Sequence, residues 1–324
     1  MIARQSVWTD KRVLELSEKF VPSADEVGRL QREKDDDCRL FQKIAEQGHY
    51  GGRLGVTRQG LYCATPSGVL LASGNTNNPD AVARMLQKAL TAWDALPEER
   101  RYLAADAKYT PKFRPESKYP LDGLVLKGVC RDLPRDSVKP VWRNAWNVEF
   151  TWFRKAEAQG FAPPELKVGA SYDVPRALVS RLARFSLRDI VRGESEPFDQ
   201  KSIEKAELKG EVTGIEKNIA TISFHGATRV AQKGKWHIEG LNDNKPTELE
   251  RGYETHLLGR AEYDLVSKKF SAFELVALGP RWGGTQFNVR GDDLKPFPMV
   301  VALRLAGETP ADRVAPSYLW DYGW

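Results

Sequence analysis

Three groups of residues in this chain carry side chains that could do chemistry, and the first pairs a cysteine with a histidine. Cys38 follows three aspartates, Asp35 to Asp37, at the expected start of a helix, and His49 follows the end of that helix. Backbone N–H groups at a helix start lower the pKa of a thiol, whereas the aspartates oppose that effect. About ten helical residues would separate the two side chains by about 15 Å. Cys38 and His49 are the candidate catalytic residues, and a structural cysteine with a backbone-bonded histidine is the alternative interpretation.

The second group contains three of the four histidines, His225, His237 and His256, all on predicted strands. Imidazoles on neighbouring strands could bind Zn²⁺ or Cu²⁺, the two cofactors that this pattern suggests. No two of these histidines stand two or four residues apart, the spacing that makes a metal motif specific. The sequence therefore leaves two interpretations, a metal site and three separate surface histidines.

The third group lies in the glycine-containing segment 281–293, which brings polar groups of several types together. We predict a pocket here with Trp282 as a flat wall and Arg281, Asn288, Arg290 and Asp292 as hydrogen-bonding groups. Glycines in the segment permit close approach of its backbone to a ligand. A long loop held by its own ion pairs is the alternative.

Composition limits the classes of function. The 324 residues suggest two domains, and 41% hydrophobic with 29% charged residues is typical of a folded soluble protein. Basic and acidic residues number 49 and 44 and are interspersed, which argues against nucleic acid as the principal partner. No apolar run approaches the ~20 residues that span a bilayer. The first residues lack the apolar core of a secretory signal, yet a mature secreted or periplasmic fragment stays open, so the compartment is not assigned.

Common catalytic motifs are missing. The chain has no C-x-x-C pair, no phosphate-binding G-x-x-x-x-G-K-[ST], no G-x-S-x-G and no H-E-x-x-H. Its three cysteines, Cys38, Cys63 and Cys130, are too few and too widely spaced for a disulfide framework. The usual nucleotide-binding, hydrolase and metalloprotease classes are therefore not indicated.

The elements that would position the first group are predicted within residues 1–96. Residues 59–65 and 69–73 form two short strands around the turn Pro66–Gly68, and a helix starts after Pro79. In that helix apolar residues recur at spacings of three and four up to Trp93, which predicts a single buried face. This strand, turn, strand and helix pattern resembles the closing half of a thioredoxin-like domain. The resemblance implies a scaffold without disulfide exchange, since the family's cysteine pair is missing.

A polar, proline-punctuated stretch, 97–120, is predicted as a linker, and 121–202 as a mixed, partly helical, Trp-rich segment. Trp142, Trp146 and Phe150 are spaced by four, which favours a helix, although Trp146, Val148, Phe150 and Trp152 also alternate as in a strand. We expect the helix, because the residues from Lys155 continue it well.

From residue 203 the hydrophobic pattern changes to a period of two. Strands are expected over 206–215, 219–226, 235–240, 253–265, 270–278 and 299–305, with the clearest hairpin at 257–265 and 270–278. Region 203–324 is accordingly predicted as an antiparallel β barrel or sandwich, and the whole chain as α+β. The aromatic tail from Tyr318 to Trp324 should dock on this domain.

Two functions follow from these expectations. The first is a non-enzymatic binding or interaction protein on a redox-inactive thioredoxin-like scaffold fused to a β domain, with a protein partner or self-association, because aromatic residues often anchor interfaces. The alternative is a metal-binding protein or metal-dependent enzyme that uses the histidines of the β domain.

Overall fold

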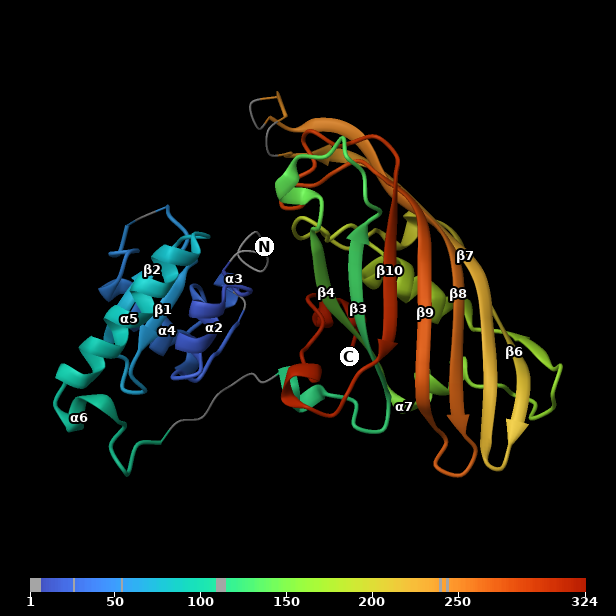
Figure 1. Cartoon of the computed structure of the whole chain (residues 1–324), viewed down its shortest axis with the longest axis horizontal. Coiled ribbons are helices and arrows are strands. Elements are labelled where there is room, and N and C mark those ends of the chain that lie inside the picture. The colour runs from blue at the N-terminus through green and yellow to red at the C-terminus, as the bar shows by residue number, and fades with distance from the viewer. Residues whose placement is uncertain (1–6, 26, 54, 109–114, 239–240, 243–244) are drawn as a thin grey trace. The chain divides into compact units, whose positions relative to one another are not determined.

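The computed structural model describes residues 7–25, 27–53, 55–108, 115–238, 241–242 and 245–324. The chain divides into two compact units, Met1–Arg114 and Pro115–Trp324 (Figure 1). The division falls inside the predicted linker, which also contains the short helix α6, Glu98–Arg101.

The N-terminal unit combines helices with a two-stranded antiparallel sheet. Its elements before α6 are α2 (Lys11–Ser17), α3 (Val27–Leu30), α4 (Asp36–Gln47), β1 (Leu61–Ala64), β2 (Leu70–Gly74) and α5 (Pro79–Ala95). Helix α4 begins where Asp35 accepts a hydrogen bond from the backbone N–H of Cys38 at 3.1 Å. Helix α5 begins with Pro79 after Asn78, which caps the N–H of Ala81 at 3.0 Å.

The core of this unit forms where the apolar face of α5 meets the strands. Val82, Leu86 and Ala89 of α5 are buried against Cys63 and Ala72 of the strands, as the helical spacing predicts. Among the described residues of this unit only β1 and β2 form a sheet. The resemblance to thioredoxin-like domains therefore stays a prediction.

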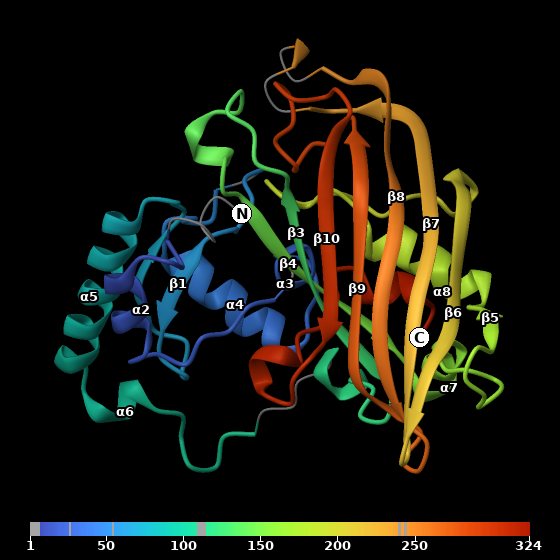
Figure 2. The same cartoon turned by 45° about the vertical axis from the view of Figure 1, so that its right-hand side comes forward.

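The C-terminal unit is built on one eight-stranded antiparallel sheet (Figure 2). Its strands are β3 (Leu124–Asp132), β4 (Trp146–Phe153), β5 (Ser171–Asp173), β6 (Ile203–Glu216), β7 (Ile219–Trp236), β8 (Thr247–Asp264), β9 (Lys269–Trp282) and β10 (Phe297–Leu305). They lie in the order β4-β3-β10-β9-β8-β7-β6-β5. The hairpin expected around residue 266 is confirmed, since β8 and β9 pair with Leu257 opposite Ala277. The strand expected at 235–240 is not separate: β7 continues to Trp236, and residues 239–240 lie outside the described part.

The predicted fold class is wrong in two respects. First, the Trp-rich segment does not stand apart, because β3 and β4 extend the same sheet through pairing of β3 with β10. The helix expected around Trp146 and Phe150 is strand β4, and only α7 (Lys155–Ala158) follows as a single helical turn. The alternation of Trp146, Val148, Phe150 and Trp152, which was the other interpretation of this segment, is the pattern that holds, because β4 pairs with β3 along its length.

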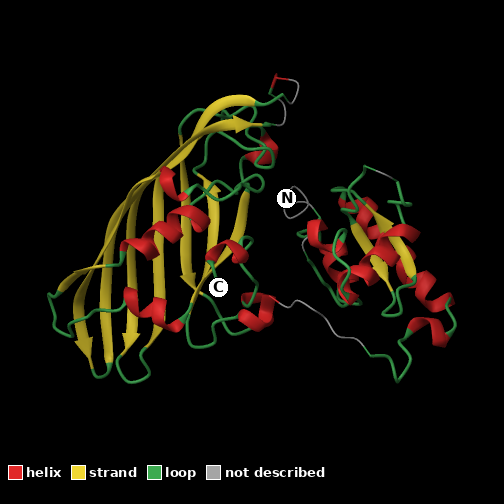
Figure 3. Cartoon of the chain, turned by 180° about the vertical axis from the view of Figure 1, so that it is seen from behind, coloured by secondary structure: helices red, strands yellow, loops and turns green. Residues whose placement is uncertain are grey.

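Second, the sheet is neither a closed barrel nor a sandwich. In the described part of the chain, β4 and β5 stay at opposite edges and do not pair with each other. Instead, helix α8 (Arg176–Arg181), the π-helical turn Leu182–Ser186 and α7 lie against the inner face (Figure 3). Phe161, in the 3-10 turn Gln159–Phe161 that follows α7, contacts Phe273 of the sheet, with ring centroids 5.7 Å apart. A layer of helical segments therefore buries the inner face that a closed barrel would fill with its own side chains.

The aromatic tail docks on the C-terminal unit, as predicted. Leu319 is buried. The ring centroids of Tyr322 and Phe185 are 5.0 Å apart, and Trp324 stacks on Trp152 with ring centroids 6.4 Å apart. The tail thereby covers the outer side of β4 near its end.

Candidate functional site

Cys38 and His49 occupy opposite ends of α4 and do not form a catalytic pair. The 12 residues of α4 span about 18 Å. Cys38 is buried, and its Sγ accepts a hydrogen bond from Arg29 Nη1 at 3.4 Å. Burial, together with Asp35, raises the pKa of Cys38 to about 11, so the thiol stays protonated at neutral pH. His49 stacks on Tyr62, and its Nε2 lies 3.1 Å from the carbonyl oxygen of Gln59. These contacts favour the structural interpretation.

The three histidines of the C-terminal unit are not gathered into one site. His225 of β7 stands opposite Leu258, and His256 of β8 stands opposite Ala227, so both lie on the outer face. His237 lies twelve residues beyond His225, about 40 Å along an extended chain. Throughout the described residues no three His, Cys, Asp or Glu side chains are grouped to hold a metal ion. The predicted zinc or copper site has no support in this arrangement.

The polar segment 281–293 forms a buried charge cluster rather than an open pocket. We define the charge cluster as Asp132, Asp189, Arg192, Arg281, Arg290 and Asp293. All three arginine side chains in it are at most 1% exposed. Of the other predicted pocket residues, Asn288 is buried and accepts a hydrogen bond from the N–H of Thr285 at 2.9 Å, and Asp292 lies at the surface beside Lys139. The indole N–H of Trp282 donates a hydrogen bond to Glu250 Oε1 at 3.1 Å.

Arg290 is the centre of the charge cluster. Its guanidinium donates to both carboxylate oxygens of Asp132 at 2.7 and 2.8 Å, and to both of Asp189 at 2.7 and 2.9 Å. A further bond reaches Asp293 at 2.8 Å. Asp293 also accepts hydrogen bonds from Arg281 and from Arg192. Every carboxylate of the cluster is thus paired with at least one arginine.

The cluster connects segments that are far apart in the sequence. Asp132 ends β3, Asp189 and Arg192 follow the π-helical turn, Arg281 lies near the end of β9, and Arg290 with Asp293 belongs to the loop before β10. Burial acts to raise the pKa of Asp293, but the hydrogen bond from Arg135 and the charges of the cluster arginines outweigh it, and the pKa falls below its ordinary value. The cluster therefore holds the β9–β10 loop to the sheet as an ion-pair network, which was the alternative interpretation.

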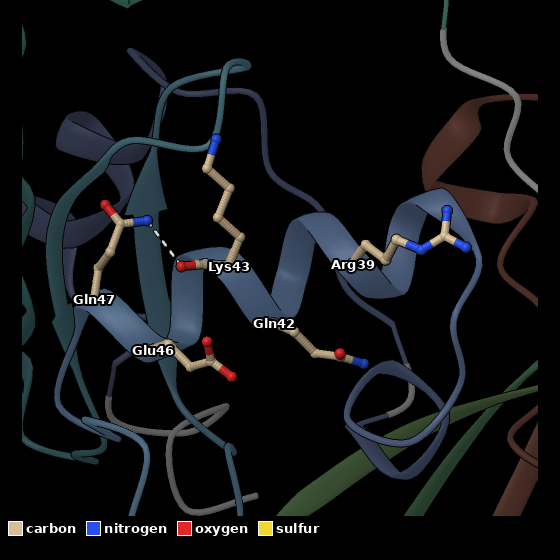
Figure 4. A pocket seen from close by; sticks show the side chains of 5 residues that line it. All are labelled: Arg39, Gln42, Lys43, Glu46 and Gln47. Carbon is tan, nitrogen blue, oxygen red and sulfur yellow. Dashed lines mark hydrogen bonds between the residues drawn. The ribbon is translucent and has the colours of Figure 1, made fainter.

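A shallow depression of about 550 Å³ lies along one side of α4 (Figure 4). The residues that line it are Arg39, Gln42, Lys43, Glu46 and Gln47. Most of these side chains are occupied by internal bonds: Lys43 Nζ donates to the carbonyl oxygen of Ser67 at 3.0 Å, and Gln47 bonds to Lys43 and Gly68 at 2.8 Å. This helix surface is held in place by those bonds and is not a strong ligand site.

The feature that sequence reasoning missed is an apolar band on the outer face of the sheet. One row of opposed side chains crosses five adjacent strands: Leu258, Val276, Ala302, Val129 and Val148. The next row adds three apolar residues, Leu278, Val300 and Trp146. In this row Arg131 of β3 stands between Val300 and Trp146. We call these eight apolar residues the outer strip. Leu258 is 66% exposed, and Trp146 is 45% exposed. Among the described residues of the C-terminal unit, no helix lies over β8, β9 and β10 on this face (Figures 1 and 2).

The two borders of the outer strip differ. Along one border stand Arg260, Glu274, Arg304 and Lys127, in consecutive cross-strand register. Lys127 is paired with Asp312 at 2.8 Å, whereas the Arg304 side chain projects outward and is exposed. The opposite border carries Pro280 facing Pro298. The strip is thus apolar, with one mainly basic border.

Comparisons with known proteins add no assignment. The chain matches no protein-family model, and neither the curated proteins nor the solved structures gave a match. Within the part of the chain that the structure describes, no helix is both long and apolar enough to cross a membrane.

Proposed function

We propose that this chain is a non-enzymatic binding protein that docks an amphipathic helix of a protein partner on the outer strip. The observation that carries the proposal is the strip itself. An antiparallel sheet with one covered face normally places polar side chains on the other face. Here one row of apolar side chains crosses five strands, and the adjacent row adds three more, with His256 and Arg131 at its other two positions. Contiguous exposed apolar surface of this kind marks interaction sites in soluble proteins.

The dimensions of the outer strip favour a helix as its occupant. Five strands spaced by about 4.8 Å give a length of about 20 Å, and two rows give a width of about 7 Å. A helix of about 14 residues has that length, and its apolar stripe covers a band of similar width. Trp146, at one end of the strip, offers the large partly buried side chain that often anchors an interface.

The charges at the border select the flank of the partner helix. Three of its four charged residues are basic, and Arg304 is exposed. Acidic residues on the side of the helix that faces this border would complement it. A second copy of the chain is a less suitable occupant. Its own opposite border, which would face the basic border, carries the uncharged Pro280 and Pro298 and so offers no complementary charge there.

The test uses two synthetic 15-residue peptides with the same leucine stripe, one flanked by glutamates and the other by lysines. Fluorescence anisotropy with the full chain measures both affinities. We expect the acidic peptide to bind at least several-fold more tightly, and Val276→Glu with Leu278→Glu to weaken it at least tenfold. Thr213→Glu is the matched control, because Thr213 is exposed on β6 outside the strip and its substitution should leave binding unchanged.

Three outcomes would overturn the proposal. The first is the absence of peptide binding. The second is an equal loss of peptide affinity in the strip variant and in the Thr213→Glu control. The third is a parent chain that light scattering shows to be a dimer and that the strip variant converts to a monomer. The last outcome would assign the strip to a second copy of the chain.

A further inference from the structure

A second depression, in the N-terminal unit, has the chemistry of an anion site. It lies between the residues that follow α3 and the glycine-containing loop before β1, and its volume is about 370 Å³. The residues that line it are Gln31, Arg32, Tyr50, Gly55, Val56, Thr57 and Arg58. Two of them are arginines and none is acidic. This site is separate from the outer strip and does not depend on the function proposed for it.

Arg58 is held in place by the fold. Its Nη1 donates to the carbonyl oxygen of Gln31 at 2.8 Å, and its guanidinium lies 4.9 Å from the ring centroid of Tyr50. The Nε–H of Arg58 is buried and has no hydrogen-bond partner among the residues that the structure describes. An arginine fixed by a backbone carbonyl and an aromatic ring loses little side-chain entropy when it binds a ligand.

Arg32 supplies a second positive charge that no described residue neutralises. Its side chain is exposed and lacks an ion pair within the described part of the chain. Arg58, by contrast, has one carboxylate within reach, Glu46 at 3.2 Å, whose side chain is 55% exposed. That surface pair is weak enough for an anion to compete with it.

The loop adds backbone and hydroxyl donors. Gly55 adopts a positive φ of +72°, and a Cβ built there would meet nothing within 4 Å, so the backbone at this position is open to an approaching ligand. Thr57 Oγ1 already accepts a hydrogen bond from the N–H of Gln59 at 3.2 Å, and its own proton remains available to donate. Open glycine-containing backbone beside arginines is a setting in which proteins bind phosphate groups.

We infer that this depression binds a small phosphate monoester, with Arg32 and Arg58 as the charged contacts. The volume is near the lower end of the range for small-molecule pockets and suits a single phosphate on a small organic group better than a dinucleotide. The arginine forks would take the phosphate oxygens, while Val56 would contact the organic part.

Isothermal titration calorimetry of the full chain with phenyl phosphate, and with inorganic phosphate as a second probe, tests the inference. We expect saturable binding of phenyl phosphate that Arg32→Ala weakens at least fivefold. Arg58→Lys should also weaken phenyl phosphate binding, because lysine keeps the positive charge but cannot make the two parallel hydrogen bonds of a guanidinium. Glu46→Gln should tighten binding about two- to fivefold, since it removes the competing carboxylate.

Arg84→Ala is the matched control: it removes an equal charge from an exposed position on α5. Equal weakening in Arg84→Ala and Arg32→Ala would overturn the inference, because general electrostatic attraction would then explain the binding. Absence of phenyl phosphate binding would also overturn it, as would unchanged affinity in Arg32→Ala. Arg32 has no side-chain hydrogen bond or ion pair to another described residue, so Arg32→Ala should leave the unit folded. Circular dichroism checks that Arg58→Lys retains its fold.

Discussion

Asp293→Asn should destabilise the C-terminal unit far more than the same change at the neighbouring Asp292. The Asp293 side chain is 11% exposed and accepts hydrogen bonds from the buried Arg192, Arg281 and Arg290. Its loss leaves three buried arginines with two cluster carboxylates, those of Asp132 and Asp189.

The magnitude follows from what each arginine retains. Arg290 keeps its hydrogen bonds to Asp132 and Asp189. Arg281 loses its hydrogen bond to the Asp293 carboxylate, and the nearest atom of Asp189, Oδ2, is 3.8 Å from Arg281 Nε. Removing one partner from a buried ion pair costs about 3–5 kcal/mol, and the asparagine oxygen recovers part of that, so we expect a loss of about 3 kcal/mol in the free energy of unfolding. Asp292 has a side chain that is 44% exposed, and the bond that it accepts from Arg192 Nη1 is 3.3 Å long, against 2.7 Å for the bond from Arg192 Nη2 to Asp293. Asp292→Asn should cost about 0–1 kcal/mol.

Urea unfolding followed by tryptophan fluorescence measures the difference. With a urea dependence of about 2–3 kcal/mol/M, the Asp293 variant should lose about 1–1.5 M in transition midpoint. Because the chain divides into two compact units, the transition assigned to the C-terminal unit is the one compared. Equal midpoints for the Asp292 and Asp293 variants would refute the view that the charge cluster stabilises the sheet.

Two further predictions concern titration. Burial opposes ionisation of Asp189 and Asp293, yet their arginine partners lower both pKa values below the ordinary value, so these groups stabilise the fold above about pH 4 and lose that contribution as the pH falls further. The stability difference between the parent and Asp293→Asn should therefore be constant above about pH 5 and begin to shrink below about pH 4. A difference at pH 3 as large as that at pH 7 would contradict this. Burial raises the pKa of Cys38 to about 11, so iodoacetamide at pH 7.5 should label Cys38 only after unfolding. Rapid labelling of the native chain, read by peptide mass mapping, would restore Cys38 as a reactive thiol.

Local sequence signals were sufficient where one element buries one face. The apolar stripe of α5, with Asn78 and Pro79 at its start, predicted both the helix and its buried side. The alternation around Leu257 and Ala277 likewise predicted the β8–β9 hairpin. In these elements the period of the hydrophobic pattern and a few cap or turn residues carry the information.

Sequence signals were misleading where neighbours cover both faces of an element. Trp142, Trp146 and Phe150 have spacings that fit a helix, but the segment from Trp146 is strand β4 because β3 pairs with it along its length. The inner side of β4 packs against the π-helical turn, where the hydroxyl oxygens of Thr151 and Ser186 are 2.6 Å apart. The C-terminal tail covers part of the outer side of β4. That pairing and that burial depend on segments remote in the sequence.

The sequence by itself determined the amphipathic helix α5, most of the strands from β6 to β10, and the absence of the common catalytic motifs, but not strands β3, β4 and β5. Only the tertiary structure decided which polar and apolar residues meet. Asp132 and Arg290 are 158 positions apart and form a bidentate ion pair. The outer strip exists because strand register aligns Val129 of β3 with Ala302 of β10. A one-residue slip would turn every one of a strand's side chains to the other face, so such surfaces are set by pairing between distant strands and not by the local pattern.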